Sequence, residues 1–146
     1  MIIISLGIAS PCLFFLLCHV VLASDDATNY AVRNMINGPS SYVDSVDLKV
    51  LRGAGDSVAV AALRILDPQR PPTEIQISSL VDMLNVAFEN IALIKDPDDR
   101  IPGVSLFMLR NVGTNRFSPT LNTKIEKMIE MLTALRVRVT TSAGRK

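Results

Sequence analysis

The chain has 146 residues, enough for one domain with a hydrophobic core of its own. Its 15 Lys and Arg against 14 Asp and Glu give a formal net charge of +1, so no strong field draws the protein to nucleic acid. Hydrophobic residues make up 49% of the sequence, and residues 1–23 raise that figure.

Residues 1–23 have the pattern of a signal peptide. His19 is their only side chain that can become positively charged, and Ala23 with a small apolar residue two positions earlier suits cleavage after Ala23. Pro11 shortens the helix that could cross a bilayer. We therefore expect a secreted, extracellular protein. The alternative is a membrane anchor formed by residues 2–23, because no Lys or Arg precedes the apolar run.

A mature chain of residues 24–146 lacks the side chains that catalysis most often uses. Both cysteines, Cys12 and Cys18, and the single histidine, His19, lie in the leader. General acid–base catalysis most often falls to His, so we expect no enzyme, no catalytic residue, no cofactor and no metal site. A secreted domain without disulfides must be held by its core alone.

The first part of the mature chain contains two short segments. Residues 27–36 favour a helix whose apolar side is Tyr30, Ala31, Met35 and Ile36. Asn37-Gly38-Pro39 should end it, with Gly or Asn in the left-handed conformation. Residues 42–51 fit a helix and a strand equally well by periodicity, and the helical context favours the helix.

Residues 57–66 predict a short helix that is buried on all sides. The run is apolar almost throughout, with Arg64 its only charge, and its alanines allow neighbouring helices to approach closely. Gly53-Ala54-Gly55 breaks the chain before it, and Asp56 is expected to cap it. Asp67-Pro68 ends it, and Arg70-Pro71-Pro72 forms a stiff link to the next element.

Residues 73–94 are predicted to form the central helix. Thr73 and Gln76 have the spacing of a capping box, and Asp96-Pro97 should stop the helix at its far end. The large apolar residues repeat at intervals of three and four, which places them on one face. These residues are Ile77, Leu80, Val81, Leu84, Phe88 and Ile91.

Two further helices are expected after the central one. Residues 103–112 follow Pro102, which suits a first helical turn, and Gly113 is a suitable C-terminal cap. A buried strand is the alternative for residues 104–109, although the chain offers no clear partner strand. Ser118-Pro119 opens the last helix, which carries a seven-residue apolar repeat with Ile129 widening it. That repeat is Leu121, Ile125, Met128, Leu132, Leu135 and Val139.

The sequence thus predicts an all-α fold, a small bundle of about five to six helices arranged as stacked hairpins after the signal segment. We expect a single helical domain at residues 24–139 and a disordered tail at residues 140–146. The helix-pair stacking resembles armadillo and HEAT proteins in general form. There is no internal repeat in residue identity, so this resemblance implies a fold type and carries no functional site.

Two polar clusters have the residue types of a binding site but lack the full motifs. The loop from Gly53 to Asp56 could hold an anion at a helix N-terminus, but it lacks a dinucleotide or phosphate-loop motif, and Asp56 places negative charge there. Asp96, Asp98 and Asp99 lack the glycine and glutamate of a calcium loop. A solvated turn is the preferred interpretation.

The lysines and the C-terminal arginines also have simple interpretations. Lys124 and Lys127 should face solvent, which leaves neither one suited to act as a base. Arg136, Arg138 and the last two residues could contact an acidic lipid or partner, but they are too few for a dense basic patch.

Two functions remain consistent with the sequence. The first is a secreted, non-catalytic module that binds a protein partner, with the binding residues unknown. The second is a carrier of a small apolar ligand in the helical core, with Met83, Met108, Met128 and Met131 as an adaptable lining. Neither function involves nucleic acid, and we expect association with a membrane only if the N-terminal segment is uncleaved.

The leader generates a direct prediction. Sequencing the N-terminus of the exported protein should give Ser24-Asp25-Asp26 as the first residues. An intact Met1 on membrane-bound protein would instead establish the anchor.

Overall fold

The computed structural model describes residues 26–38, 49–112 and 116–145, and within these ranges the chain is all-helical and has no strand. This confirms the predicted fold class. The elements are α2 (Asp26–Asn37), α4 (Ser57–Ile65), α5 (Glu74–Ala87), the 3-10 helix η1 (Ile91–Leu93), α6 (Gly103–Val112) and α7 (Pro119–Ala143).

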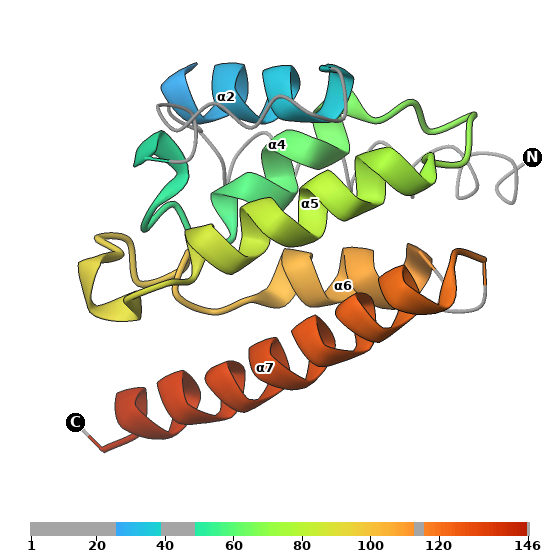
Figure 1. The fold of residues 1–146 in the computed structure, drawn as a ribbon. Coiled ribbons are helices and arrows are strands. Elements are labelled where there is room, and N and C mark those ends of the chain that lie inside the picture. The colour runs from blue at the N-terminus through green and yellow to red at the C-terminus, as the bar shows by residue number, and fades with distance from the viewer. Residues whose placement is uncertain (1–25, 39–48, 113–115, 146) are drawn as a thin grey trace, which may run out of the picture.

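The helices form three layers (Figure 1). At the top α2 lies across α4 and α5, which pack against each other in the middle layer. Below them, α6 contacts α4 and α7 contacts α5, and α6 and α7 also pack together. The two predicted hairpins, α4–α5 and α6–α7, are therefore stacked helix on helix.

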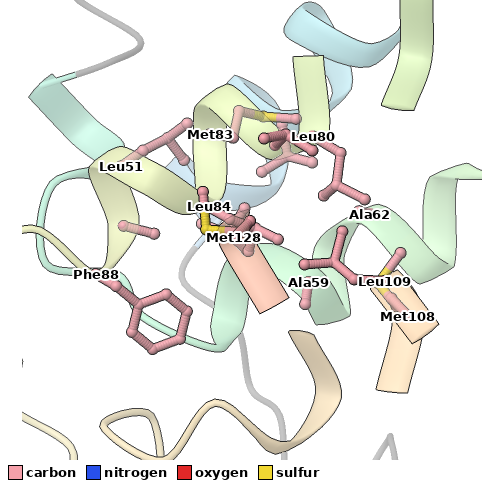
Figure 2. Packing of buried hydrophobic residues seen from close by; sticks show 14 of the residues in the cluster. Leu51, Ala59, Ala62, Leu80, Met83, Leu84, Phe88, Met108, Leu109 and Met128 are labelled. Carbon is pink, nitrogen blue, oxygen red and sulfur yellow. The ribbon is translucent and has the colours of Figure 1, made fainter. Parts of the chain in front are cut away.

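The core fills the space between these layers. Figure 2 shows buried side chains from four helices meeting, among them Ala62 of α4, Leu84 of α5, Leu109 of α6 and Met128 of α7. The prediction that this helix is buried on all sides holds for its first part, where Val58 to Ala62 are buried, but not for its end, where Leu63 and Ile65 are half-buried and Arg64 is exposed. The small size of the buried residues permits the close packing of α2, α5 and α6 around α4.

The central helix begins as predicted but ends early. Thr73 accepts a hydrogen bond from the Gln76 N–H at 3.2 Å, and the Gln76 side chain accepts one from the Thr73 N–H at 3.0 Å, which completes the capping box. The predicted end near Ile94 is wrong, because α5 stops at Ala87 and Asn90 adopts a left-handed φ of 54°. Asn tolerates that conformation better than most residues, so it redirects the chain before the proline is reached.

The apolar face of α5 is otherwise as predicted. Ile77, Leu80, Val81 and Leu84 are buried. Phe88 is also buried at the helix end, whereas Ile91 has moved into η1 and is half-buried.

The remaining segments extend or adjust the predictions. In α2, Tyr30 is exposed while Val32 is buried, and neither Asn37 nor Gly38 takes the expected left-handed conformation. Residues 49–51 are helical, whereas most of the ambiguous 42–51 segment lies outside the described residues, as do the leader and Gly113. None of the described helices is long and apolar enough to cross a membrane.

The last helix confirms its predicted seam and exceeds its predicted length. Five of the six seam residues are buried and Val139 is half-buried. Ser118 caps the start, accepting a hydrogen bond from the Leu121 N–H at 3.4 Å. Helix α7 continues to Ala143, past the domain boundary expected at residue 139, and the Thr140 and Thr141 hydroxyls donate back to carbonyls one turn earlier.

The packing predicts a strong contrast between two leucines. Replacing the fully buried Leu84 by Ala should lower the free energy of unfolding by about 2–5 kcal/mol. The substitution leaves a cavity beside α5, and the surrounding side chains can fill it only partially. The control Leu93→Ala, at a side chain that is 62% exposed, should change it by less than about 0.5 kcal/mol. Urea denaturation of both variants measures the difference, and equal effects would contradict the assigned core.

Candidate functional site

Asp56 is a buried carboxylate that joins the two hairpins. Its Oδ2 accepts a hydrogen bond from the Val104 N–H at 2.8 Å. Its Oδ1 accepts from the Ser105 N–H at 2.8 Å and from the Ser105 hydroxyl at 2.6 Å. The sequence predicted that Asp56 caps the helix after it, and this is wrong, because its side chain makes no hydrogen bond at the start of α4. It caps the N-terminus of α6 instead, which we call the Asp56 cap.

The loop before Asp56 is held against two other segments. The Gly55 N–H donates to the Ala87 carbonyl at 3.0 Å, and the Asp56 N–H donates to the Asp99 carbonyl at 3.1 Å. Gly55 has a φ of +58°, and a Cβ there would collide with the Asp99 carbonyl oxygen, so glycine is required on both counts.

Asp99 makes the reciprocal contact. Its Oδ2 accepts a hydrogen bond from the Ser57 hydroxyl at 2.9 Å, at the first residue of α4. The loop before each hairpin thus directs a carboxylate to the start of the first helix of the other hairpin. Negative charge at these helix N-termini is also favoured by the helix dipole.

Burial has a cost for both carboxylates. It raises the pKa of the Asp56 carboxyl above the ordinary value of 3.8, against the opposing effect of hydrogen bonds from Ser105 and Val104. Burial likewise raises the pKa of Asp99, where the Ser57 hydroxyl opposes the shift and the neighbouring acids Asp96, Asp56 and Asp98 add to it.

These contacts assign structural roles to two of the polar clusters. The Gly55 and Asp56 N–H groups are occupied by carbonyls, so the loop does not present them to an anion. Asp96 accepts from the Asp98 N–H at 2.9 Å, which forms a local turn, while Asp99 faces Ser57. In the described parts of the chain, no group of three or more His, Cys, Asp and Glu side chains is placed to hold a metal ion.

The basic residues of α7 lie at the surface. Lys124 pairs with Asp82 across the α5–α7 contact at 3.7 Å, and both side chains are about half exposed, at 49% and 52%. Lys127, Arg136 and Arg138 are exposed.

An apolar surface groove of about 490 Å³ separates the end of α4 and its following loop from α6. We call it the α4–α6 groove. Its apolar wall is made of Leu63, Leu66, Phe107, Met108 and Val112.

Phe107 and the prolines give the groove its character. Phe107 is 51% exposed, although it lies in the most apolar part of α6. Pro68, Pro71 and Pro72 form the opposite rim. Proline fixes the backbone φ, so this rim is stiff before any ligand arrives.

Polar side chains border the groove with an excess of positive charge. Arg70 and Arg116 contribute guanidinium groups, against the single carboxylate of Asp67. Asp67 is engaged locally, since it accepts the Gln69 N–H at 2.8 Å and lies 3.8 Å from the Arg70 Nε. The Arg116 guanidinium lies 5.9 Å from the centre of the Phe117 ring, within the range of a cation–π contact.

Two further depressions follow the contact between α5 and α7. One, of about 460 Å³, contains Glu74, Ile75 and Lys124. The other, of about 240 Å³, contains Asp82, Lys127 and Met131. The first depression has one lysine against one carboxylate, Lys124 against Glu74, whereas the second has two lysines, Lys124 and Lys127, against the carboxylate of Asp82.

The sequence predicts no binding residue and does not predict the α4–α6 groove. The sequence predicts a stiff link within residues 67–72, and it places Phe107 in the run of residues 104–109 for which a buried strand is the alternative to a helix. The three prolines beside Arg70 were the available signal. Comparisons with protein-family models, with curated proteins and with solved structures find no match.

The Asp56 cap predicts a pH-dependent loss of stability on substitution. Asp56→Ala should lower the free energy of unfolding by about 2 kcal/mol or more near pH 4, because it leaves buried donors of α6 unpaired. A carboxyl whose folded pKa is raised binds its proton more tightly when folded. The contribution of the Asp56 carboxyl to the free energy of unfolding is therefore fully present below the unfolded pKa of 3.8 and is lost as the pH rises through the folded pKa. The difference in free energy of unfolding between wild type and Asp56→Ala should therefore narrow toward neutral pH.

Urea titrations at several pH values measure this difference. Asp98→Ala is the control, because Asp98 is exposed and its substitution should cost less than about 0.5 kcal/mol. A difference that widens as the pH rises would contradict the assigned direction.

Proposed function

We propose that the protein is a secreted, non-catalytic α-helical interaction module that binds another protein through the α4–α6 groove. The observation that carries this proposal is the groove itself. It combines an exposed aromatic side chain, Phe107, with a stiff proline rim and two arginines. Aromatic residues and Arg are the side chains that most often dominate binding energy at protein interfaces.

The non-catalytic part of the proposal is supported by the roles of the buried acids. Asp56 and Asp99 both direct their carboxylate oxygens to helix starts, and Ser105, which lies beside Asp56, is fully buried. A mature chain of residues 24–146 also has no Cys and no His. These features favour binding over chemistry.

The carrier hypothesis receives less support. It requires an apolar ligand inside the helical core, but Met83, Met108 and Met128 pack there against other side chains. The three depressions described above lie at the surface. A surface groove is better suited to a segment of another protein than to an enclosed small molecule.

Partner capture from secreted material tests the proposal. Immobilised purified protein should retain a specific partner, and Phe107→Ser should reduce that capture by about tenfold or more, because it removes the aromatic anchor of the groove. Quantitative mass spectrometry of the retained proteins measures the ratio.

Leu93→Ser is the matched control for this experiment. Leu93 is 62% exposed and lies outside the groove, so its substitution removes a comparable apolar surface elsewhere. Retention of no protein above background, or equal loss with both variants, would count against binding through this groove.

A further inference from the structure

We propose that the α4–α6 groove recognises an acidic segment of a partner protein, in which a large apolar side chain is flanked by Asp or Glu. This inference rests on the proposed function and specifies the chemistry of the partner. The shared feature is an apolar floor bordered by guanidinium groups.

Charge complementarity selects an acidic occupant. Arg70 and Arg116 both line the groove, and the side chain of Arg70 is 88% exposed. The opposing carboxylate of Asp67 already accepts the Gln69 N–H and pairs with Arg70. With Asp67 counted, the groove has one positive charge in excess, so a partner carboxylate can add charge-assisted hydrogen bonds to a guanidinium, whereas a basic segment would be repelled.

The apolar floor selects a single large anchor. One side of the floor is formed by Phe107 and Val112 of α6. The other side is formed by Leu63 at the end of α4 and by Leu66 just after it, so the floor is apolar from both sides. Its volume of about 490 Å³ is in the lower part of the range for ligand sites. It suits one large side chain and its neighbours better than a folded domain.

The proline rim determines how a segment is recognised. Pro68, Pro71 and Pro72 have no N–H, and the Arg70 N–H already donates to the Asp67 carbonyl at 3.2 Å. The rim therefore offers few backbone donors for pairing with an added strand. Recognition must come from side chains, namely the guanidinium groups and the anchor pocket.

The α5–α7 depressions provide the contrasting surface. The depression that contains Glu74 has balanced lining charges, because Lys124 is its only cation. The depression that contains Asp82 has one positive charge in excess, as the α4–α6 groove does, but it is only about 240 Å³ in volume and no aromatic side chain lines it. It therefore lacks the large apolar floor that would hold an anchor beside the acidic residues of a partner.

Selection from a phage-displayed library of random dodecapeptides on the purified protein tests this proposal. The enriched peptides should carry Asp or Glu around an aliphatic or aromatic residue. The affinity of a synthetic enriched peptide is then measured by fluorescence polarisation. The double variant Arg70→Glu, Arg116→Glu should weaken binding by about tenfold or more. High salt should weaken it as well, because exposed charges are screened.

The matched control is Lys127→Glu with Arg138→Glu. It changes the net charge by the same amount on exposed residues outside the groove, and it should alter the affinity by less than about twofold. Because all four positions are exposed, both double variants should keep the wild-type circular dichroism spectrum and melting temperature.

Other outcomes overturn the inference in distinguishable ways. Neutral or basic peptides that still require Phe107 would retain the groove and the proposed function but reject the acidic partner. If only the Lys127 and Arg138 substitutions abolish peptide binding, the binding site lies on α7 and outside the α4–α6 groove. Binding to vesicles of anionic phospholipid that the Arg70 and Arg116 substitutions abolish, with no peptide enriched, would assign the groove to a lipid surface. Absence of any enriched peptide and of any captured partner would reject the proposed function as well.

Discussion

The fold depends on the Asp56 cap. A helix leaves its first N–H groups without partners inside the helix, and burying them unpaired is costly. In this protein the start of α6 is buried against the α4–α5 hairpin, so its donors must be satisfied from there. Asp56 supplies both carboxylate oxygens to Val104 and Ser105. The stacking of the hairpins is therefore specified by hydrogen bonds as well as by apolar packing.

The sequence predicted the helices better than it predicted their connections. The capping box at Thr73 and the apolar seam of α7 are local patterns, and both are present as predicted. The end of α5 was misplaced because Asn90 in a left-handed conformation stops the helix before the downstream proline can. The prediction that Asp56 caps the adjacent helix α4 was also wrong, because it used only neighbouring residues. Local reasoning assigns a cap to the nearest N-terminus, whereas its true partners lie 48 and 49 residues away.

The candidate site illustrates a different limit. A groove is formed by residues from separate segments, so no single stretch of sequence contains it. Residues 67–72 predicted a stiff link, and Phe107 lies in a segment predicted only as a helix or a buried strand. Their opposition across the α4–α6 groove depends on how α6 is placed against α4, and the Asp56 cap holds the first turn of α6 in that placement together with the apolar packing. The structural and the proposed functional features are thus connected through one side chain.

The distance along the chain between Asp56 and Ser105 has a consequence for folding. Closing so long a loop costs conformational entropy, and the hydrogen bonds of the cap form only after that cost has been met. Since α4 and α5 are neighbours along the chain, we expect their hairpin to form before α6 docks onto it. Once α6 is docked, separating the hairpins breaks several buried hydrogen bonds at once. We therefore expect the two halves of the domain to unfold together as one cooperative unit.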